Sequence, residues 1–395
     1  MRANVPRRRA ERRGLRLWPV GPVLVLSFLA AVLVAAGAFL AGWGLLGVEG
    51  LRPERRLASS TLFDLVKLSF GVVAGAGALV ALVVAYRRQR IDEDGALREA
   101  TRLHTERFTT AVSQLGDEAA AVRLGGVHAL AGLADDAPTR ELRQTCIDVL
   151  CAYLRLPYTA EADIPEDDAA ARHGYRALRE VRLTVIRLIR DHLRLPAEDP
   201  RSWQGHHFDF TGVRFDGGDF SEAVFSGGTV DFSSSEFSSE TVSFRSAEFS
   251  GALVDFRDTA FNGGVVTFSD AVFTAGTADF TFAHFPHGLV FFERAWFAGA
   301  VVRFDNAIFD GSFVSFNDSV FAGGAVEFSE SLFAGGSVEF SEAVLSEGTV
   351  GFRGSEFSGG TLDFGRAGGD APTGLPTSGP YVGIRLPEEW SSPGS

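Results

Sequence analysis

The chain contains few of the residue types that carry redox and metal chemistry. Its 395 residues include 2 cysteines, 1 methionine and a single lysine, Lys67. Cys146 and Cys151 lie five positions apart in a segment with helical periodicity, so they point to different faces, which argues against a disulfide or a shared metal. Two thiols are also too few to indicate an oxidising compartment. We interpret both cysteines as buried, reduced side chains.

Catalytic motifs are missing as well. The sequence contains no G-x-S-x-G nucleophile elbow, no Walker phosphate loop and no H-E-x-x-H zinc motif. The close pairs His206 with His207 and His284 with His287 have no cysteine or carboxylate set at ligand spacing beside them. We therefore predict a protein that is not an enzyme and that binds no cofactor or metal. A β-helix hydrolase or lyase is the third-ranked alternative, and it requires a groove with clustered acids.

Charge is distributed unevenly, although the total is −13 at pH 7. Residues 1–90 hold 14 basic residues against 4 acidic ones, whereas residues 225–368 hold 19 acidic residues and 6 arginines. The basic end coincides with two apolar runs. Residues 18–48 contain no charge, and residues 68–86 end at Arg87, Arg88 and Arg90. Both runs are long enough for a bilayer, which takes about 20 apolar residues.

These runs predict a basic tail, residues 1–17, followed by a two-helix transmembrane hairpin in the lipid bilayer, residues 18–90. A cleaved signal peptide fits less well, because its apolar region runs only about 7–15 residues. Cationic flanks at both outer ends place both termini in the cytoplasm, as a multi-pass protein of the cell membrane. Small residues four apart, such as Gly37 with Ala41 and Gly71 with Gly75, favour close helix packing and a homo-oligomer.

Residues 91–200 show the apolar spacing of α-helices, and Pro165, Pro196 and Pro200 mark boundaries within this region. The stretch AVRLGGVHALAGLA resembles one helix of an armadillo or HEAT unit. We predict a helical domain that joins the membrane hairpin to the C-terminal half of the chain.

The C-terminal half repeats itself with a period of twelve residues. The first column of the repeat consists of Phe225, Phe237, Phe249, Phe261, Phe273, Phe285, Phe297, Phe309, Phe321, Phe333, Leu345 and Phe357. The second column, seven places later, consists of Phe232, Phe244, Phe256, Phe268, Phe280, Phe292, Phe304, Phe316, Phe328, Phe340, Phe352 and Phe364. A fixed short period predicts a stacked solenoid, in which each unit buries its apolar face only against its neighbours.

Five-residue units introduce this region: DFTGV, RFDGG, DFSEA and VFSGG follow one another from residue 209. The pattern resembles the pentapeptide-repeat proteins over about residues 209–368, and this resemblance implies a right-handed, quadrilateral β-helix. The helical segment and the apolar runs also resemble the N-terminal half of bacterial membrane proteins that carry such repeats. After Phe225 the spacing between successive phenylalanines of the two columns alternates between seven and five residues. Glycine pairs such as Gly263-Gly264 enter the longer units, where a corner or bulge requires positive φ.

The repeat allows coils of 12 or 24 residues. Twelve residues leave almost no room inside, whereas 24 enclose four phenylalanines, two valines and two small residues. We predict six coils of 24 after about one coil of simple pentapeptides, with the helical domain capping the first coil and the tail, residues 369–395, capping the last. The expected fold is thus α+β and multidomain: two transmembrane helices, a helical linker or cap domain, and a right-handed β-helix over residues 205–368.

Two sets of outward-facing residues are candidates for function. The residue before each first-column position turns apolar in the later repeats, which predicts a protein-interaction surface formed by Val272, Trp296, Ile308, Val320, Leu332 and Val344. This column is either free or covered by the C-terminal tail. The second set consists of the residue that precedes every second Phe of the second column. It forms an acidic column of Asp231, Asp255, Asp279 and Glu327, in which Arg303 stands between Asp279 and Glu327. Its simplest interpretation is a solvating surface.

Together these patterns predict a membrane-anchored, non-catalytic scaffold that displays a β-solenoid in the cytoplasm to a protein partner. The alternative is an acidic solenoid that mimics DNA and binds a nucleic-acid-binding protein, as some pentapeptide-repeat proteins do. In neither case do we expect direct contact with nucleic acid.

Overall fold

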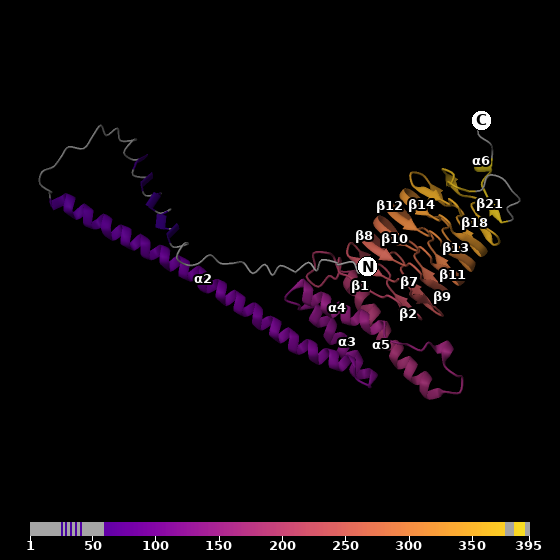
Figure 1. The fold of residues 1–395 in the computed structure, drawn as a ribbon, viewed down its shortest axis with the longest axis horizontal. Coiled ribbons are helices and arrows are strands. Elements are labelled where there is room, and N and C mark those ends of the chain that lie inside the picture. Colours follow the sequence, from indigo (N-terminus) through magenta and orange to yellow (C-terminus); the bar gives the residue numbers. More distant parts are fainter. Residues whose placement is uncertain are drawn as a thin grey trace, which may run out of the picture. The chain divides into compact units, whose positions relative to one another are not determined.

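The computed structural model describes residues 25–26, 28–29, 32–33, 36–37, 40–41, 59–375 and 383–391 (Figure 1). The chain divides into two compact units, Met1–Glu99 and Ala100–Ser395. Each unit is described by itself below.

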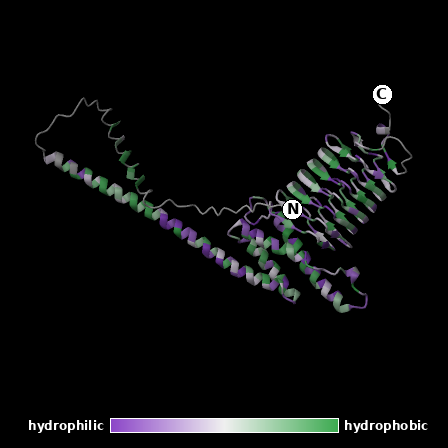
Figure 2. Cartoon of the chain, viewed as in Figure 1, coloured by the Kyte–Doolittle hydropathy of each residue, from purple (hydrophilic) through white to green (hydrophobic). Residues whose placement is uncertain are grey.

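In the first unit, the dominant element is the beginning of helix α2 (Ser59–Leu115). Among the described residues, one helix segment, Val66–Leu115, is long and apolar enough to cross a membrane (Figure 2). Its apolar stretch is not buried within the structure. The predicted first span, residues 18–48, lies largely outside the described residues, so the two-span hairpin stays a prediction. The structure also joins the second apolar run to the following polar segment in one uninterrupted helix.

In the second unit, the end of α2 is followed by α3 (Ala120–Asp135), α4 (Arg140–Leu154), the 3₁₀ helix η1 (Glu161–Asp163) and α5 (Ala169–Leu193). A side chain at Gly126 would lie 2.6 Å from the backbone nitrogen of Leu115, so glycine permits the close crossing of α3 with the end of α2. Cys146 and Cys151 are buried and free, and burial raises their pKa to about 11 and about 12. They are therefore inert thiols, as the sequence predicted.

The rest of the second unit is a β-solenoid made of two parallel sheets. The 10-stranded sheet follows the order β1 (Phe208–Asp209), β5 (Thr229–Asp231), β8 (Glu248–Asp255), β10 (Val272–Asp279), β12 (Trp296–Arg303), β14 (Val320–Glu327), β16 (Val344–Leu345) and β20 (Gly368–Gly369), with β4 (Val224–Phe225) and β17 (Thr349–Gly351) beside this path. The 11-stranded sheet follows the order β2 (Arg214–Phe215), β6 (Glu236–Phe237), β9 (Ala260–Thr267), β11 (His284–Phe291), β13 (Ile308–Ser315), β15 (Leu332–Glu339), β19 (Thr361–Asp363) and β21 (Ile384–Arg385), with β3 (Gly218–Asp219), β7 (Thr241–Ser243) and β18 (Glu356–Phe357) beside it.

The register confirms the predicted coil length. Trp296 pairs with Val320, and Phe285 pairs with Phe309, which are 24 residues apart in each case. The first coil is shorter, since Phe208 pairs with Val230. This difference follows from the simple pentapeptides at the start, which lack the two residues that every second later unit gains.

The phenylalanines of both columns fill the interior, as predicted. Phe280 stacks on Phe256 at 4.6 Å and on Phe304 at 4.7 Å between ring centroids, in the coils on either side. Within the core it meets Phe268 and Phe292 edge-on, at interplanar angles of 85° and 82°. These offset and edge-on contacts are the arrangements that aromatic quadrupoles favour.

Bulges within the strands explain the inserted glycines, because the pairing of β9 with β11 shifts register across Gly263 and Gly264. Gly264 has a φ of +65°, and a side chain there would lie 2.4 Å from the carbonyl oxygen of Glu240 in the coil beneath. Only glycine fits this position. The turns between the strands place a non-glycine residue at positive φ once every twelve residues, for example Asp258, Asp270 and Phe282.

Both ends of the solenoid are covered, which prevents edge-to-edge association. Helices α4 and α5 pack against β1 and β3 of the first coil. At the other end, Ile384 of β21 pairs with Leu362, and Trp390 of α6 (Glu388–Ser391) packs edge-on against Phe364 at 5.7 Å. The indole nitrogen of Trp390 donates to the carbonyl oxygen of Gly369 at 2.9 Å. These contacts confirm the predicted caps.

Candidate interaction surfaces

The apolar residues predicted as one column form two separate rows. Val272, Trp296, Val320 and Val344 lie in register on β10, β12, β14 and β16 of the 10-stranded sheet, and we name them the Trp296 row. Ile308 and Leu332 lie in register on β13 and β15 of the other sheet and form the Ile308 row. The single column was wrong because each 24-residue coil contributes one such residue to each sheet.

The Trp296 row is the longer of the two. Trp296 is 50 % exposed and Val344 is 45 % exposed, while Val272 and Val320 are half-buried. Glu248 continues the row at one end and Gly368 at the other, so four consecutive coils present an apolar side chain. The described part of the C-terminal tail pairs with both sheets at the end of the solenoid. Gly369 pairs with Leu345 and Thr373 with Gly351 in the sheet of the Trp296 row, and Ile384 pairs with Leu362 in the other sheet.

Sequence reasoning missed a further outward position, three residues before each second-column phenylalanine. Leu253 on β8 is 47 % exposed and Leu289 on β11 is 40 % exposed. Phe313 on β13 occupies the same position and contacts Phe291 edge-on at 6.1 Å. The alternation along a strand would have identified this position, because it lies two residues from the one already assigned to the outside.

The acidic residues do lie in one line, and each aspartate has a structural task. Asp231, Asp255 and Asp279 are in register on β5, β8 and β10. Each accepts a hydrogen bond from the backbone N–H two residues later, donated by Ser233, Arg257 and Thr281 at 2.8, 2.9 and 3.0 Å. They therefore cap the turns that follow the strands.

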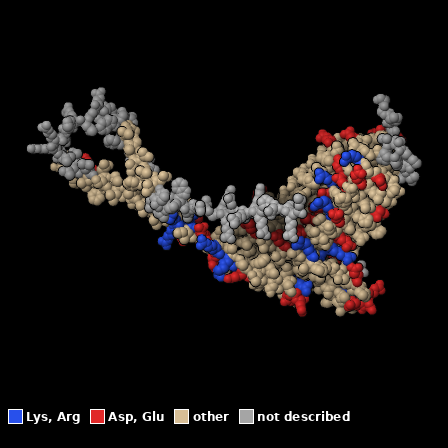
Figure 3. All heavy atoms as spheres, viewed as in Figure 1, with Lys and Arg blue, Asp and Glu red and all other residues tan. Residues whose placement is uncertain are grey.

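The acidic line is also partly neutralised. Asp255 is only 6 % exposed, and the Arg257 guanidinium donates to both its oxygens, with Nε at 2.9 Å from each. The hydrogen bonds to Asp255 raise the pKa of Arg257. Arg303 then interrupts the line before Glu327. On the face seen in Figure 3, acidic and basic side chains of the solenoid lie interspersed.

Glu327 departs from the aspartate pattern. The turn that follows it is capped from the preceding coil, because Asp305 accepts the N–H of Ser329 at 3.1 Å. Burial and the nearby Asp305 raise the pKa of Glu327. Charges along such a row are spaced by coils, about 4.7–4.9 Å apart, whereas phosphates follow at about 3.4 Å per DNA strand. The line is thus a poor copy of a phosphate backbone.

A polar cluster joins the helices to the first coil. Asp216 is 4 % exposed and accepts hydrogen bonds from the hydroxyls of Tyr158 and Tyr175, the latter at 2.7 Å. Burial and the bond to Asp216 raise the pKa of Tyr175 to about 12, so its hydroxyl remains a donor. The guanidinium of Arg179 lies 3.5 Å from Asp216, and that of Arg182 lies over the Tyr158 ring at 4.2 Å. These residues are distant in sequence, and no local sequence pattern predicts the cluster.

The histidine pairs have structural partners. His206 Nδ1 contacts Gln144 Oε1 at 2.9 Å, and burial, aided by Arg140, lowers the pKa of His206 to about 4. His284 contacts Asp310 at 3.1 Å. Among the residues that the structure describes, no group of three or more histidines, cysteines or acids could hold a metal ion.

A family model described as pentapeptide repeats in nine copies matches residues 210–259. No curated protein and no solved structure matches the chain. The repeat match falls on the first coils of a solenoid whose 24-residue register and stacked phenylalanines continue to residue 364. The chain is a pentapeptide-repeat protein.

Proposed function

We propose that this protein is a membrane-anchored scaffold whose solenoid presents the Trp296 row to a protein partner. The observation that carries the proposal is the row itself, four apolar side chains in register with a half-exposed tryptophan among them. Tryptophan is enriched among the residues that dominate binding energy at protein interfaces. A solenoid also offers an extended rigid surface rather than an enclosed pocket.

The charges around the row favour a partner with a basic rim. Residues 225–368 hold 19 acidic residues against 6 arginines. Asp318 and Glu342 each precede a member of the row by two residues and both are exposed, and Glu342 pairs with Arg366 at 3.1 Å. Arg294, which precedes Trp296 in the same way, is paired with Asp270 at 2.7 Å. A partner with an apolar centre and a lysine- or arginine-rich edge would match this arrangement.

The exposed apolar part of α2 supports the anchoring half of the proposal. The segment within Val66–Leu115 has the length and composition of a membrane span. Arg87, Arg88 and Arg90 follow its apolar stretch, which favours a cytoplasmic position for the solenoid. The second span, the orientation and the lack of catalysis stay predictions.

The double substitution Trp296→Glu/Val320→Glu tests the row. It places two charges on the apolar surface and should weaken partner binding at least about tenfold, as expected for loss of a tryptophan hot spot. The measurement is quantitative co-purification from solubilised membranes of the native host. The control is Ile308→Glu/Leu332→Glu, which makes the same change on the other sheet and should leave binding unchanged. Equal binding by wild type and the Trp296 variant would refute the assignment.

A further inference from the structure

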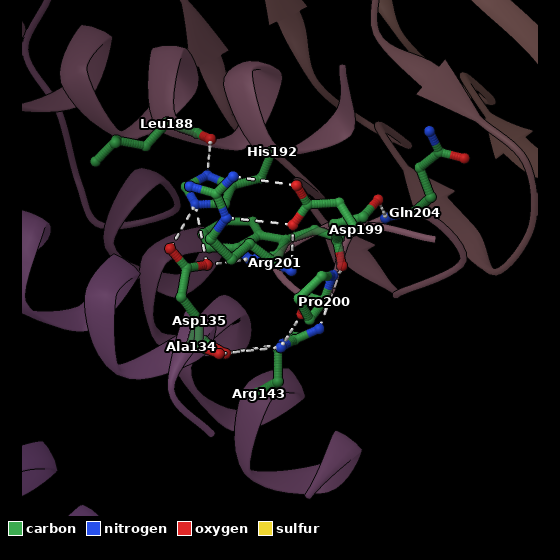
Figure 4. A network of polar contacts seen from close by, with 11 residues as sticks. Ala134, Asp135, Arg143, Leu188, His192, Asp199, Pro200, Arg201 and Gln204 are labelled. Atoms are coloured by element: carbon green, nitrogen blue, oxygen red, sulfur yellow. Dashed lines mark hydrogen bonds and ion pairs between the residues drawn. The ribbon is translucent and has the colours of Figure 1, made fainter. Parts of the chain in front are cut away.

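His192 lies in the last turn of α5, where three elements meet. Its ring stacks on the fully buried Trp203, with centroids 4.1 Å apart and planes inclined by 15°. Trp203 belongs to residues 194–207, the connection from α5 to the first solenoid strand, β1. The third element is α3, whose last residue, Asp135, lies beside the Nε2 edge of the His192 ring (Figure 4).

Both ring nitrogens of His192 face hydrogen-bond acceptors. Nδ1 lies 2.6 Å from the carbonyl oxygen of Leu188, and Nε2 lies 3.0 Å from Asp135 Oδ1. A backbone carbonyl and an ionised carboxylate cannot donate, and neutral imidazole has only one N–H. Both contacts are therefore satisfied only when the ring carries two protons and a positive charge. The stacked indole adds a face that attracts a cation.

The connection is held by the same cluster. Arg143 of α4 donates to the carbonyl oxygens of Ala134, Asp135, Pro200 and Ser202. The backbone N–H of Trp203 donates to the carbonyl oxygen of His192 at 3.3 Å, and its indole N–H donates to Asp135 at 3.4 Å. Asp135 thus holds both the histidine and the tryptophan of the connection.

The charged groups around His192 come from every element packed on it. They are Asp135 of α3, Arg143 of α4, Asp191 of α5, and Asp199 and Arg201 of the connection. Burial lowers the pKa of His192, but the hydrogen bonds to Asp135 and Leu188 and the charges of Asp135 and Asp191 outweigh it, and the pKa is raised.

We infer that His192 is a proton-operated latch that fastens the connection to the helical cap of the solenoid. In its charged form it joins α3, α5 and Trp203, and the first coil is held firmly against the helices. When it loses a proton, one of the two nitrogen contacts must break. Since folding raises the pKa, the stabilisation is complete below the unfolded value of about 6.5. It is lost as pH rises through the folded-state pKa.

Hydrogen–deuterium exchange of the full chain in detergent tests the latch. Protection of the peptide covering residues 194–206 is measured between about pH 5.5 and about pH 8.5, on either side of the ordinary histidine pKa. Rates are corrected for the intrinsic pH dependence of amide exchange. The wild type should lose protection several-fold as pH rises, whereas His192→Gln should show low protection at every pH.

Asp135→Asn provides a second variant that does not remove the ring. It should shift the loss of protection to lower pH, because the neutral amide no longer favours the imidazolium. Asp136→Asn, one residue along, is the matched control and should follow the wild type. A wild-type profile that stays flat after correction would overturn the latch. A parallel loss of protection in wild type and His192→Gln would do the same.

Discussion

Replacing Phe280 by alanine is expected to lower the free energy of unfolding by about 3–5 kcal/mol, the usual cost of removing a buried phenylalanine. The Phe280 ring is fully buried in the middle of the solenoid. It contacts Phe256 and Phe304 above and below, and Phe268 and Phe292 at its sides. Each coil packs only against its neighbours, so a cavity here divides the stack into two shorter ones.

Phe282 provides the matched control two residues away. Its side chain is 56 % exposed on a corner and takes no part in the stacks. Phe282→Ala should therefore change stability by less than about 0.5 kcal/mol. Urea unfolding of both variants, followed by far-ultraviolet circular dichroism, makes the comparison. Similar losses in the two variants would show that the rings do not stack inside the coil.

Asp216→Ala is expected to have an effect of similar size, about 3–5 kcal/mol, at the junction between the helices and the first coil. The substitution removes the buried acceptor of two tyrosine hydroxyls and one of the two carboxylates that pair with Arg179, which keeps Glu240. Such uncompensated buried groups are costlier than the loss of the contact itself. The helical cap should then separate from the solenoid before the solenoid unfolds.

Limited proteolysis and thermal unfolding report this separation. Asp216→Ala should expose cleavage sites in residues 194–207 at temperatures where the wild type is resistant. Glu161→Ala is the control, because its pairing with Arg176 at 4.0 Å is largely exposed and should contribute no more than about 1 kcal/mol. If both variants melt as the wild type does, Asp216 is not the centre of the junction.

The solenoid could be predicted from the sequence because its repeat pattern is set by residues that are close in the chain. Each coil repeats the same spacing, so the phenylalanine columns, the glycine bulges such as that at Gly264 and the 24-residue coil all follow from periodicity and available volume. The capping of the first and last coils also follows, since unpaired strand edges need cover. These features depend on neighbours in the repeat rather than on contacts distant in sequence.

The predictions of the outward-facing residues were less complete, because they depend on how the repeat is divided between two sheets. The twelve-residue spacing predicts one column that contains both Trp296 and Ile308, whereas a 24-residue coil places them on different sheets. The prediction of an acidic column rests on the charge of Asp231, Asp255 and Asp279, whereas their capping role follows from their position ahead of a turn.

The junction could not have been predicted from local patterns. Tyr158, Tyr175 and Asp216 meet only after the helices have packed on the first coil. The same holds for His192 with Asp135 and Trp203. The arginine cluster predicts a domain boundary at residue 90, and α2 continues through it to Leu115. No proline lies between Pro53 and Pro138 to end the helix.

Disulfide mapping tests most directly whether the Trp296 row exists as a continuous surface. Val320 and Val344 are paired in register on neighbouring parallel strands, at the strand spacing of about 4.7–4.9 Å. This lies within the Cα separation of about 4.4–6.8 Å that a disulfide spans. In Val320→Cys/Val344→Cys, mild oxidation should form an intramolecular cross-link within one chain, while the native thiols stay buried.

The control pair is Leu332→Cys/Val344→Cys, which is twelve residues apart and lies on different sheets. Mass spectrometry of proteolytic peptides identifies which pair is linked. The 24-residue coil predicts a link between positions 320 and 344 and none between 332 and 344. The reverse result would contradict the row and the interaction surface built on it.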